Sequence, residues 1–162
     1  MRGLRNNNPL NIRHSRSCWQ GMAKEQTDAE FVTFETLAYG YRAAWRILFN
    51  YFYRFVGEKK RFTVRNIVER WAPPTENDTE AYIRTVLQLS GIGGQEKLLP
   101  PNNVQSYRRL SRLIVAMTVM ENGIRPEEVD TEAIYQGYQL AFPDNVKALE
   151  ECLLEEDEYE EW

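Results

Sequence analysis

The chain has 162 residues, of which 43% are hydrophobic, and this is enough for one domain with an apolar core. Two cysteines and one histidine exclude a disulfide framework and show no zinc-ligand spacing, so we expect no metal and no cofactor. No apolar run approaches the roughly 20 residues that a membrane-spanning helix needs.

The net charge of -4 is unevenly distributed along the chain. Eight acidic residues and no Lys or Arg lie from Glu150 onward, which leaves 20 basic against 16 acidic residues before it. We therefore predict one domain over residues 1–149 and an acidic tail over residues 150–162, with about the last six residues disordered. The excess of basic residues over residues 1–149 favours binding to an anionic polymer such as nucleic acid or bacterial cell wall. It is equally typical of an ordinary solvated surface.

Two segments near the N-terminus predict irregular or β structure. Residues 2–13, RGLRNNNPLNIR, predict no helix because three asparagines followed by Pro9 favour turns and extended backbone. Asparagine side chains donate and accept hydrogen bonds, so they either fix this loop or bind sugar hydroxyl and acetamido groups. Cys18 to Phe34 predicts a small β-hairpin or meander, since its last four residues alternate in polarity after a polar connection.

Three helices are predicted next. Residues 38–57 carry an aromatic stripe at helical spacing, which is more typical of a core than of a cofactor site. Residues 63–71 form a second helix, with Trp71 on its apolar face and therefore expected in the core. Residues 77–91 form a third helix, which begins at Asn77 with a sequence like a capping box.

The strongest functional signal lies within residues 103–126. The apolar stripe of this helix passes through Met117, and Glu121 extends it four residues later, before Gly123 provides a left-handed stop. A carboxylate at the buried end of a core helix costs free energy unless it has a use. Two further helices are predicted, over residues 130–143 and from residue 144 onward.

The order of these signals resembles the lysozyme superfamily, especially the glucosaminidases and lytic transglycosylases that cut bacterial peptidoglycan. In those enzymes a core helix ends in a catalytic glutamate and precedes an Asn-rich strand similar to NNNPLNIR, a hairpin with Trp and Gly, and a helix with Gly-Tyr-Arg-Ala-like residues. A later helix bears a substrate-site tyrosine, and WAPPTENDTEAYI, residues 71–83, is similar to it, with Asn77 and Tyr82 at the matching positions. The resemblance covers roughly residues 2–125. It implies an α+β, predominantly α-helical, lysozyme-like domain with a small N-terminal β-hairpin or meander.

The chain departs from the family at one point. Its Asn-rich strand lies almost at the N-terminus, so no glutamate helix precedes it, whereas AMTVMENG, residues 116–123, is similar to the missing helix end. We interpret the chain as a circularly permuted lysozyme-like domain in which Glu121 packs beside residues 6–13, a rearrangement that is cheap when the original termini lie close together. Short proteins that begin RGxRNNNPxNIR also look like phage or mobile-element proteins.

The resemblance implies a peptidoglycan-cleaving glycosidase of the lytic transglycosylase or glucosaminidase/muramidase type, with Glu121 as general acid. Burial at an apolar helix end raises a carboxyl pKa toward the working range. In the transglycosylase branch the same group then acts as base on the sugar's own 6-hydroxyl, and we favour this single-acid mechanism. Hydrolysis needs a second acid, for which Glu30 or Glu35 is the candidate. The residues assigned to substrate binding are Asn8, Asn11, Arg13, Trp19, Asn77 and Tyr82. Trp71, which we expect in the core, is the alternative to Trp19 for stacking on a sugar ring.

Several alternatives remain beside this hypothesis. In the alternative for Glu121, this residue has no catalytic role and forms an ion pair with Arg112 or Arg125. In the alternative for Tyr82, this residue packs in the core and does not bind substrate. The alternative function is that of a non-catalytic phage or mobile-element structural protein on the same lysozyme-like scaffold. We expect peptidoglycan glycan strands as the partner, and neither nucleic acid nor a membrane, because no nucleic-acid-binding motif accompanies the basic N-terminus. Without a visible signal peptide, we expect synthesis in the cytoplasm and then virion association or export by another route.

Overall fold

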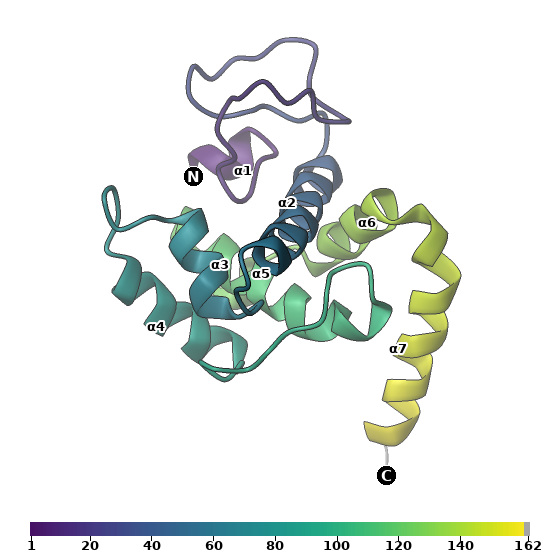
Figure 1. Cartoon of the computed structure of the whole chain (residues 1–162). Helices are drawn as coiled ribbons and strands as arrows, with labels where there is room; N and C mark the ends of the chain where they lie inside the picture. Colours follow the sequence, from purple (N-terminus) through teal and green to yellow (C-terminus); the bar gives the residue numbers. More distant parts are fainter. Residues whose placement is uncertain (161–162) are drawn as a thin grey trace.

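The computed structural model describes residues 1–160, with side chains up to residue 157. Helices dominate the described residues, as predicted (Figure 1). The α-helices are α1 (Arg2–Arg5), α2 (Leu37–Gly57), α3 (Val64–Trp71), α4 (Thr79–Ser90), α5 (Tyr107–Asn122), α6 (Thr131–Ala141) and α7 (Val146–Glu160). Three short 3₁₀ turns lie between them, η1 (Val104–Ser106), η2 (Pro126–Glu128) and η3 (Pro143–Asn145).

Helix α2 forms the centre of one shared core. It packs closely against α6, where a Cβ on Gly137 would lie 2.7 Å from the Cβ of Tyr41, so the absence of a side chain permits this approach. The indole of Trp45 donates to the carbonyl oxygen of Ile134 across 3.1 Å. The Tyr41 hydroxyl lies 3.1 Å from the hydroxyl of Thr118, which connects α2 with α5. Buried polar groups are therefore paired at the contacts that hold α2, α5 and α6 together.

Several helix ends confirm the predictions made from local residues. Thr63 accepts a hydrogen bond from the backbone of Asn66 at the start of α3, and Asp130 accepts one from Ala133 at the start of α6. Gly123 has φ 63°, the left-handed conformation that ends α5. These signals act within a few residues, so the sequence alone was sufficient for them.

The start of α4 differs from the prediction. Asp78, not Asn77, accepts the capping hydrogen bond from the backbone N–H of Ala81, at 3.1 Å. The Asn77 side chain instead donates to the carbonyl oxygen of Pro73 across 3.2 Å. The helix therefore starts one residue later than the capping-box sequence suggested, and Asn77 belongs to the connection between α3 and α4.

The predicted N-terminal β-hairpin is wrong for the residues that the structure describes. Between residues 13 and 34 there are two isolated bridges, Arg13 with Phe31 and Met22 with Phe34, and no continuous ladder. The Gln26 side chain donates to Thr33 O and accepts from Thr33 N, both at 2.8 Å. A side chain thus makes the bonds that a neighbouring strand would make, and the segment forms a loop over the start of α2 (Figure 1).

The expectation of no helix in residues 2–13 is also wrong, because Arg2–Arg5 forms the single turn α1. The backbone N–H of Asn8 donates to Gly3 O across 2.8 Å and closes this turn. Asp28 connects the turn to the following loop, since it accepts two bonds from Arg2 (2.5 and 2.6 Å) and one from Asn6 (3.0 Å). We call residues 1–36, tied together in this way, the N-terminal lobe.

The C-terminal acidic segment is helical where the structure describes it. We expected disorder over about the last six residues, but residues 157–160 continue α7, and residues 161–162 lie outside the described part. Arg108 on α5 pairs with Glu156 and, at 2.6 Å, with Asp157. These ion pairs give the acidic residues a basic partner that the distribution of charge along the chain did not reveal. No helix within residues 1–160 is long and apolar enough to cross a membrane.

Candidate active site

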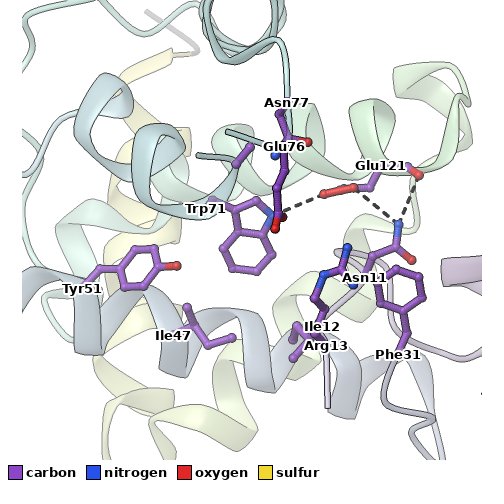
Figure 2. A pocket seen from close by; sticks show the side chains of 11 residues that line it. Asn11, Ile12, Arg13, Phe31, Ile47, Tyr51, Trp71, Glu76, Asn77 and Glu121 are labelled. Atoms are coloured by element: carbon purple, nitrogen blue, oxygen red, sulfur yellow. Dashed lines mark hydrogen bonds between the residues drawn. The ribbon is translucent and has the colours of Figure 1, made fainter. Parts of the chain in front are cut away.

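A pocket of about 330 Å³ lies where the N-terminal lobe, α2, the α3–α4 connection and the end of α5 meet (Figure 2). It combines aromatic and aliphatic side chains with amides, one guanidinium and two carboxylates. Such a mixture of apolar walls and a few polar groups is typical of a small-ligand site. The pocket is lined by Asn11, Ile12, Arg13, Phe31, Ile47, Tyr51, Trp71, Ala72, Glu76, Asn77 and Glu121.

Glu121 presents its carboxylate to this pocket from the last turn of α5. Its Oε1 accepts a hydrogen bond from the indole Nε1–H of Trp71 across 3.3 Å. Its Oε2 lies 3.4 Å from the amide nitrogen of Asn11, which also donates to the Glu121 carbonyl oxygen across 3.3 Å. Among the described side chains, no Lys or Arg nitrogen lies within 4.0 Å of the carboxylate, so the ion pair with Arg112 or Arg125 is not formed.

Burial raises the pKa of Glu121 above its ordinary value of 4.5. The hydrogen bonds from Trp71 and Asn11 and the positive charge of Arg13 act in the opposite direction, but they do not outweigh the loss of solvation. The carboxyl group is therefore protonated over a wider pH range than an exposed glutamate. A protonated carboxyl facing a pocket is able to donate a proton to a bound ligand.

Hydrogen bonds within the N-terminal lobe and to α5 hold the Asn-rich segment beside Glu121. Asn8 is fully buried and uses its amide within the lobe, donating to Ile12 O (2.9 Å) and Val32 O (2.8 Å). Asn11 has φ 53°, a left-handed conformation that asparagine tolerates better than most residues. Asn122 on α5 donates to the Pro9 carbonyl oxygen across 2.7 Å. The end of α5 and the segment around Asn11 are consequently in direct contact.

The predicted substrate-binding residues separate into two groups. Asn11, Arg13 and Asn77 line the pocket together with Glu121. Asn8 is a structural residue of the lobe, and Trp19 packs at the edge of a small apolar cluster around Val32, so neither lines the pocket.

Tyr82 lies behind the pocket wall. It is 8% exposed, and its hydroxyl has no hydrogen-bond partner among the described residues. Burial, with a smaller contribution from the charge of Glu121, raises the pKa of the Tyr82 hydroxyl far above its usual range. The phenol is therefore neutral and close to Glu121, without touching the open pocket.

The two candidate second acids, Glu30 and Glu35, do not line the pocket. Glu30 is paired with Arg2 and Arg13, each at 3.5 Å. Glu35 is exposed just before α2. The structure places both outside the group of side chains that surrounds Glu121.

One relative is similar over most of the chain: Protein P5 of Pseudoalteromonas phage PM2 is 39% identical over 144 residues, which is 87% of this chain and 82% of the relative. The chain belongs to the family of phage PM2 Protein P5. No protein-family model matches the sequence. The phage origin of this relative agrees with the expected similarity to phage proteins, and the name Protein P5 carries no statement of activity.

In this member of the Protein P5 family, sequence reasoning missed several residues of the pocket. Trp71 is half-buried and donates to Glu121, whereas the apolar face of its helix had placed it in the core. Tyr51 and Trp71 form an edge-to-face pair with ring centroids 6.4 Å apart, and they give the pocket an aromatic wall. Glu76 was passed over although it is the residue before Asn77. Only the WAPPTEN sequence pointed to this part of the site.

The Protein P5 family member shows no group of three or more His, Cys, Asp or Glu side chains able to hold a metal ion within the described residues. The pocket contains the Glu121 carboxyl group with its raised pKa, amide donors and acceptors on Asn11 and Asn77, and the positive charge of Arg13. Amides and aromatic faces are suited to hydroxyl-rich and acetamido-bearing sugars. The arrangement therefore fits acid chemistry on an uncharged or carboxylated sugar.

Proposed function

We propose that this protein is a peptidoglycan-cleaving glycosidase with Glu121 as its general acid. The observation that carries the proposal is the Glu121 carboxyl group, half-buried in the pocket with a raised pKa and hydrogen-bonded by Trp71 and Asn11. A glycosidic oxygen is a poor leaving group until it is protonated. A carboxyl group whose pKa is raised stays protonated to higher pH than an ordinary glutamate, and so is better able to supply the required proton.

The other pocket residues support a sugar polymer as substrate. Asn11 and Asn77 present amides that pair with hydroxyl or acetamido groups, and Trp71 and Tyr51 provide faces on which sugar rings pack. Arg13 is 65% exposed at the pocket rim, where a lactyl or peptide carboxylate of peptidoglycan would meet it. The contact of Glu121 with residues near Asn11 also supports the permuted lysozyme-like arrangement proposed from the sequence.

The substitution Glu121→Gln tests the proposal. It keeps the shape of the side chain and removes the transferable proton, so the release of soluble fragments from purified peptidoglycan should fall roughly 100-fold or more. Glu127→Gln is the matched control, because Glu127 is an exposed acid in η2 outside the pocket. Circular dichroism should show the same helix content for both variants. Equal activity of wild type and Glu121→Gln would refute the role of Glu121.

A second candidate function follows from the similarity to a phage protein. On this view the protein is a non-catalytic component of a phage or mobile element, built on the same scaffold. It predicts that the wild type releases no fragments from peptidoglycan and associates with particles or with other copies of itself. The peptidoglycan assay on the wild type separates the two candidates.

A further inference from the structure

We infer that Glu76 is the second carboxylate of this site and activates a water molecule, so that the reaction is hydrolysis and not transglycosylation. This inference rests on the proposed function and specifies its second half. It differs from the mechanism expected from the sequence, in which Glu121 acted alone or together with Glu30 or Glu35. Four features of the structure support it: the position of Glu76, the rigidity of its segment, its freedom from ion pairs, and the contrast with Glu121.

Glu76 reaches the pocket from a different element than Glu121. It lies on the α3–α4 connection, whereas Glu121 ends α5, and both line the same pocket of about 330 Å³. In Figure 2 the Glu76 side chain extends from this connection into the pocket, on the side of the Trp71 indole, and the Glu121 carboxylate enters from α5. A sugar bound against Trp71 would therefore have one carboxylate from each element beside it. Glycosidases that hydrolyse their substrate place a pair of carboxylates in this way around the bond they cleave.

The connection that carries Glu76 is fixed at both ends. The backbone N–H of Glu76 donates to Pro73 O across 3.1 Å, and Asn77 donates to the same oxygen. The buried hydroxyl of Thr79 donates to Ala72 O across 2.6 Å, which ties the start of α4 to the end of α3. Pro73 and Pro74 further restrict the backbone. These bonds tie the backbone of the segment to the end of α3, which fixes the point from which the Glu76 side chain enters the pocket.

The Glu76 carboxylate is free of ion pairs. Among the described side chains, no Lys or Arg nitrogen lies within 4.0 Å of it, whereas Glu30 pairs with two arginines and Glu80 with Arg65. Glu76 is also exposed to solvent. It is therefore available to accept a proton from water, in contrast to Glu30.

The two carboxyl groups of the pocket have opposite environments. Glu121 is half-buried and hydrogen-bonded to Trp71 and Asn11, whereas Glu76 faces the open side of the pocket. Different environments of this kind let one carboxyl act as acid while its neighbour acts as base. This asymmetry assigns the proton donor to Glu121 and the proton acceptor to Glu76.

The step is balanced as follows. Glu121 transfers its proton to the glycosidic oxygen while the bond from that oxygen to the anomeric carbon breaks. A water oxygen forms the new bond to the anomeric carbon, and the proton that this water loses passes to the Glu76 carboxylate. Glu121 then carries the negative charge, and exchange of one proton with solvent restores both groups. No oxidant, reductant or metal takes part.

The test compares wild type with Glu76→Gln, Glu76→Ala, Glu121→Gln and the control Glu127→Gln on purified peptidoglycan. The measured quantities are the rate of fragment release and the mass of the new sugar ends, with the reaction run in ¹⁸O-labelled water and the products reduced at once with borohydride. We expect wild type to produce reducing ends that contain one ¹⁸O atom. We expect Glu76→Gln to be slower by roughly 100-fold, as for other residues that transfer a proton in catalysis.

Rescue separates a chemical role from a structural one. Sodium formate, a small carboxylate, should restore part of the rate of Glu76→Ala and leave Glu121→Gln unchanged. If wild type cleaves and Glu76→Gln retains its rate, or if the new ends are 1,6-anhydro sugars without ¹⁸O, the inference about Glu76 is overturned and the role of Glu121 stands. If wild type releases no fragments, the proposed function fails, and the inference fails with it.

Discussion

The indole Nε1–H of Trp71 donates to Oε1 of Glu121 across 3.3 Å, although the two residues are 50 positions apart in the chain. Trp71 is the last residue of α3, and Glu121 lies in the last turn of α5. A donor aimed at the carboxylate stabilises its charged form, which opposes the effect of burial on the pKa of Glu121. The donor therefore helps to set the pH range over which the acid is protonated.

Replacing Trp71 by Phe should shift the pH–rate profile. The substitution keeps an aromatic wall and removes the donor, so the pKa of Glu121 should rise further. Because the proposed acid works only when protonated, the alkaline limb of the profile should move to higher pH. The measurement is fragment release from peptidoglycan between pH 4 and 9, with Tyr53→Phe as control at an exposed site. An alkaline limb that does not move would show that this hydrogen bond does not tune the acid.

Glu121→Gln should gain stability relative to wild type as the pH rises. A carboxyl whose folded-state pKa is raised contributes most to stability below its unfolded pKa of about 4.5, and this contribution is lost as the pH rises through the folded-state value. Gln has no charge to bury, so the difference in unfolding free energy should move in favour of the variant between pH 4.5 and 8. Urea unfolding at several pH values measures it. A difference that is constant with pH would contradict the burial of this carboxyl.

Asp28→Asn should destabilise the N-terminal lobe at neutral pH. The guanidinium of Arg2, together with backbone N–H groups and Asn6, holds the pKa of Asp28 well below its usual range. A lowered carboxyl pKa contributes stability above the ordinary value of 3.8, and that stability is lost as the pH falls. The difference between variant and wild type in urea unfolding should therefore shrink in acid. Glu25→Gln, at an exposed acid of the same loop, should show no comparable effect.

Gly40→Ala should be destabilising by roughly 1–3 kcal/mol. A Cβ at Gly40 would lie 2.0 Å from the carbonyl oxygen of Asn7 and 2.8 Å from Cδ of Pro9, so the lobe would have to move off α2. Gly57→Ala is the matched control, because nothing lies within 4 Å of a Cβ at that helical position. The control should be neutral or more stable by up to about 1 kcal/mol. Equal unfolding free energies for both variants would contradict the close contact between the lobe and α2.

Tyr82→Phe should separate packing from substrate binding. Its buried hydroxyl has no partner among the described residues, so removing it should not lower stability. If the hydroxyl takes part in substrate binding, as the sequence resemblance implied, fragment release should fall by about tenfold. Thermal unfolding measures the change in stability, and the peptidoglycan assay measures the change in the rate of fragment release. Unchanged activity would assign Tyr82 to the core.

The sequence was a good guide where the deciding interactions are local. Thr63 begins α3 and Gly123 ends α5 through contacts within a few residues, and both helix ends were predicted. The hairpin failed because Thr33, in the alternating segment, bonds to the side chain of Gln26, and Val32 and Phe34 donate to Ile12 and Asn6 near the N-terminus. No alternation pattern reveals these partners.

The pocket was harder to predict than the helices. The apolar spacing around Glu121 indicated an unusual buried acid, and the Asn-rich segment was expected beside it. The hydrogen bond from Trp71 to Glu121 and the place of Glu76 in the pocket were not predicted, because both depend on how the α3–α4 connection packs against α5. Helical spacing places Trp71 on an apolar face, and it does not show that this face ends at a pocket. Glu76 lies in a loop, where no periodic pattern exists.

The contact between Asn11 and Glu121 spans 110 positions of sequence. During synthesis from the N-terminus, the lobe and α2 leave the ribosome long before the helix that completes the pocket. A nascent chain that ends before α5 therefore lacks the carboxyl group that Asn11 contacts. The pocket is complete only when the chain has emerged as far as Asn122, about three quarters of its length, and α5 has docked.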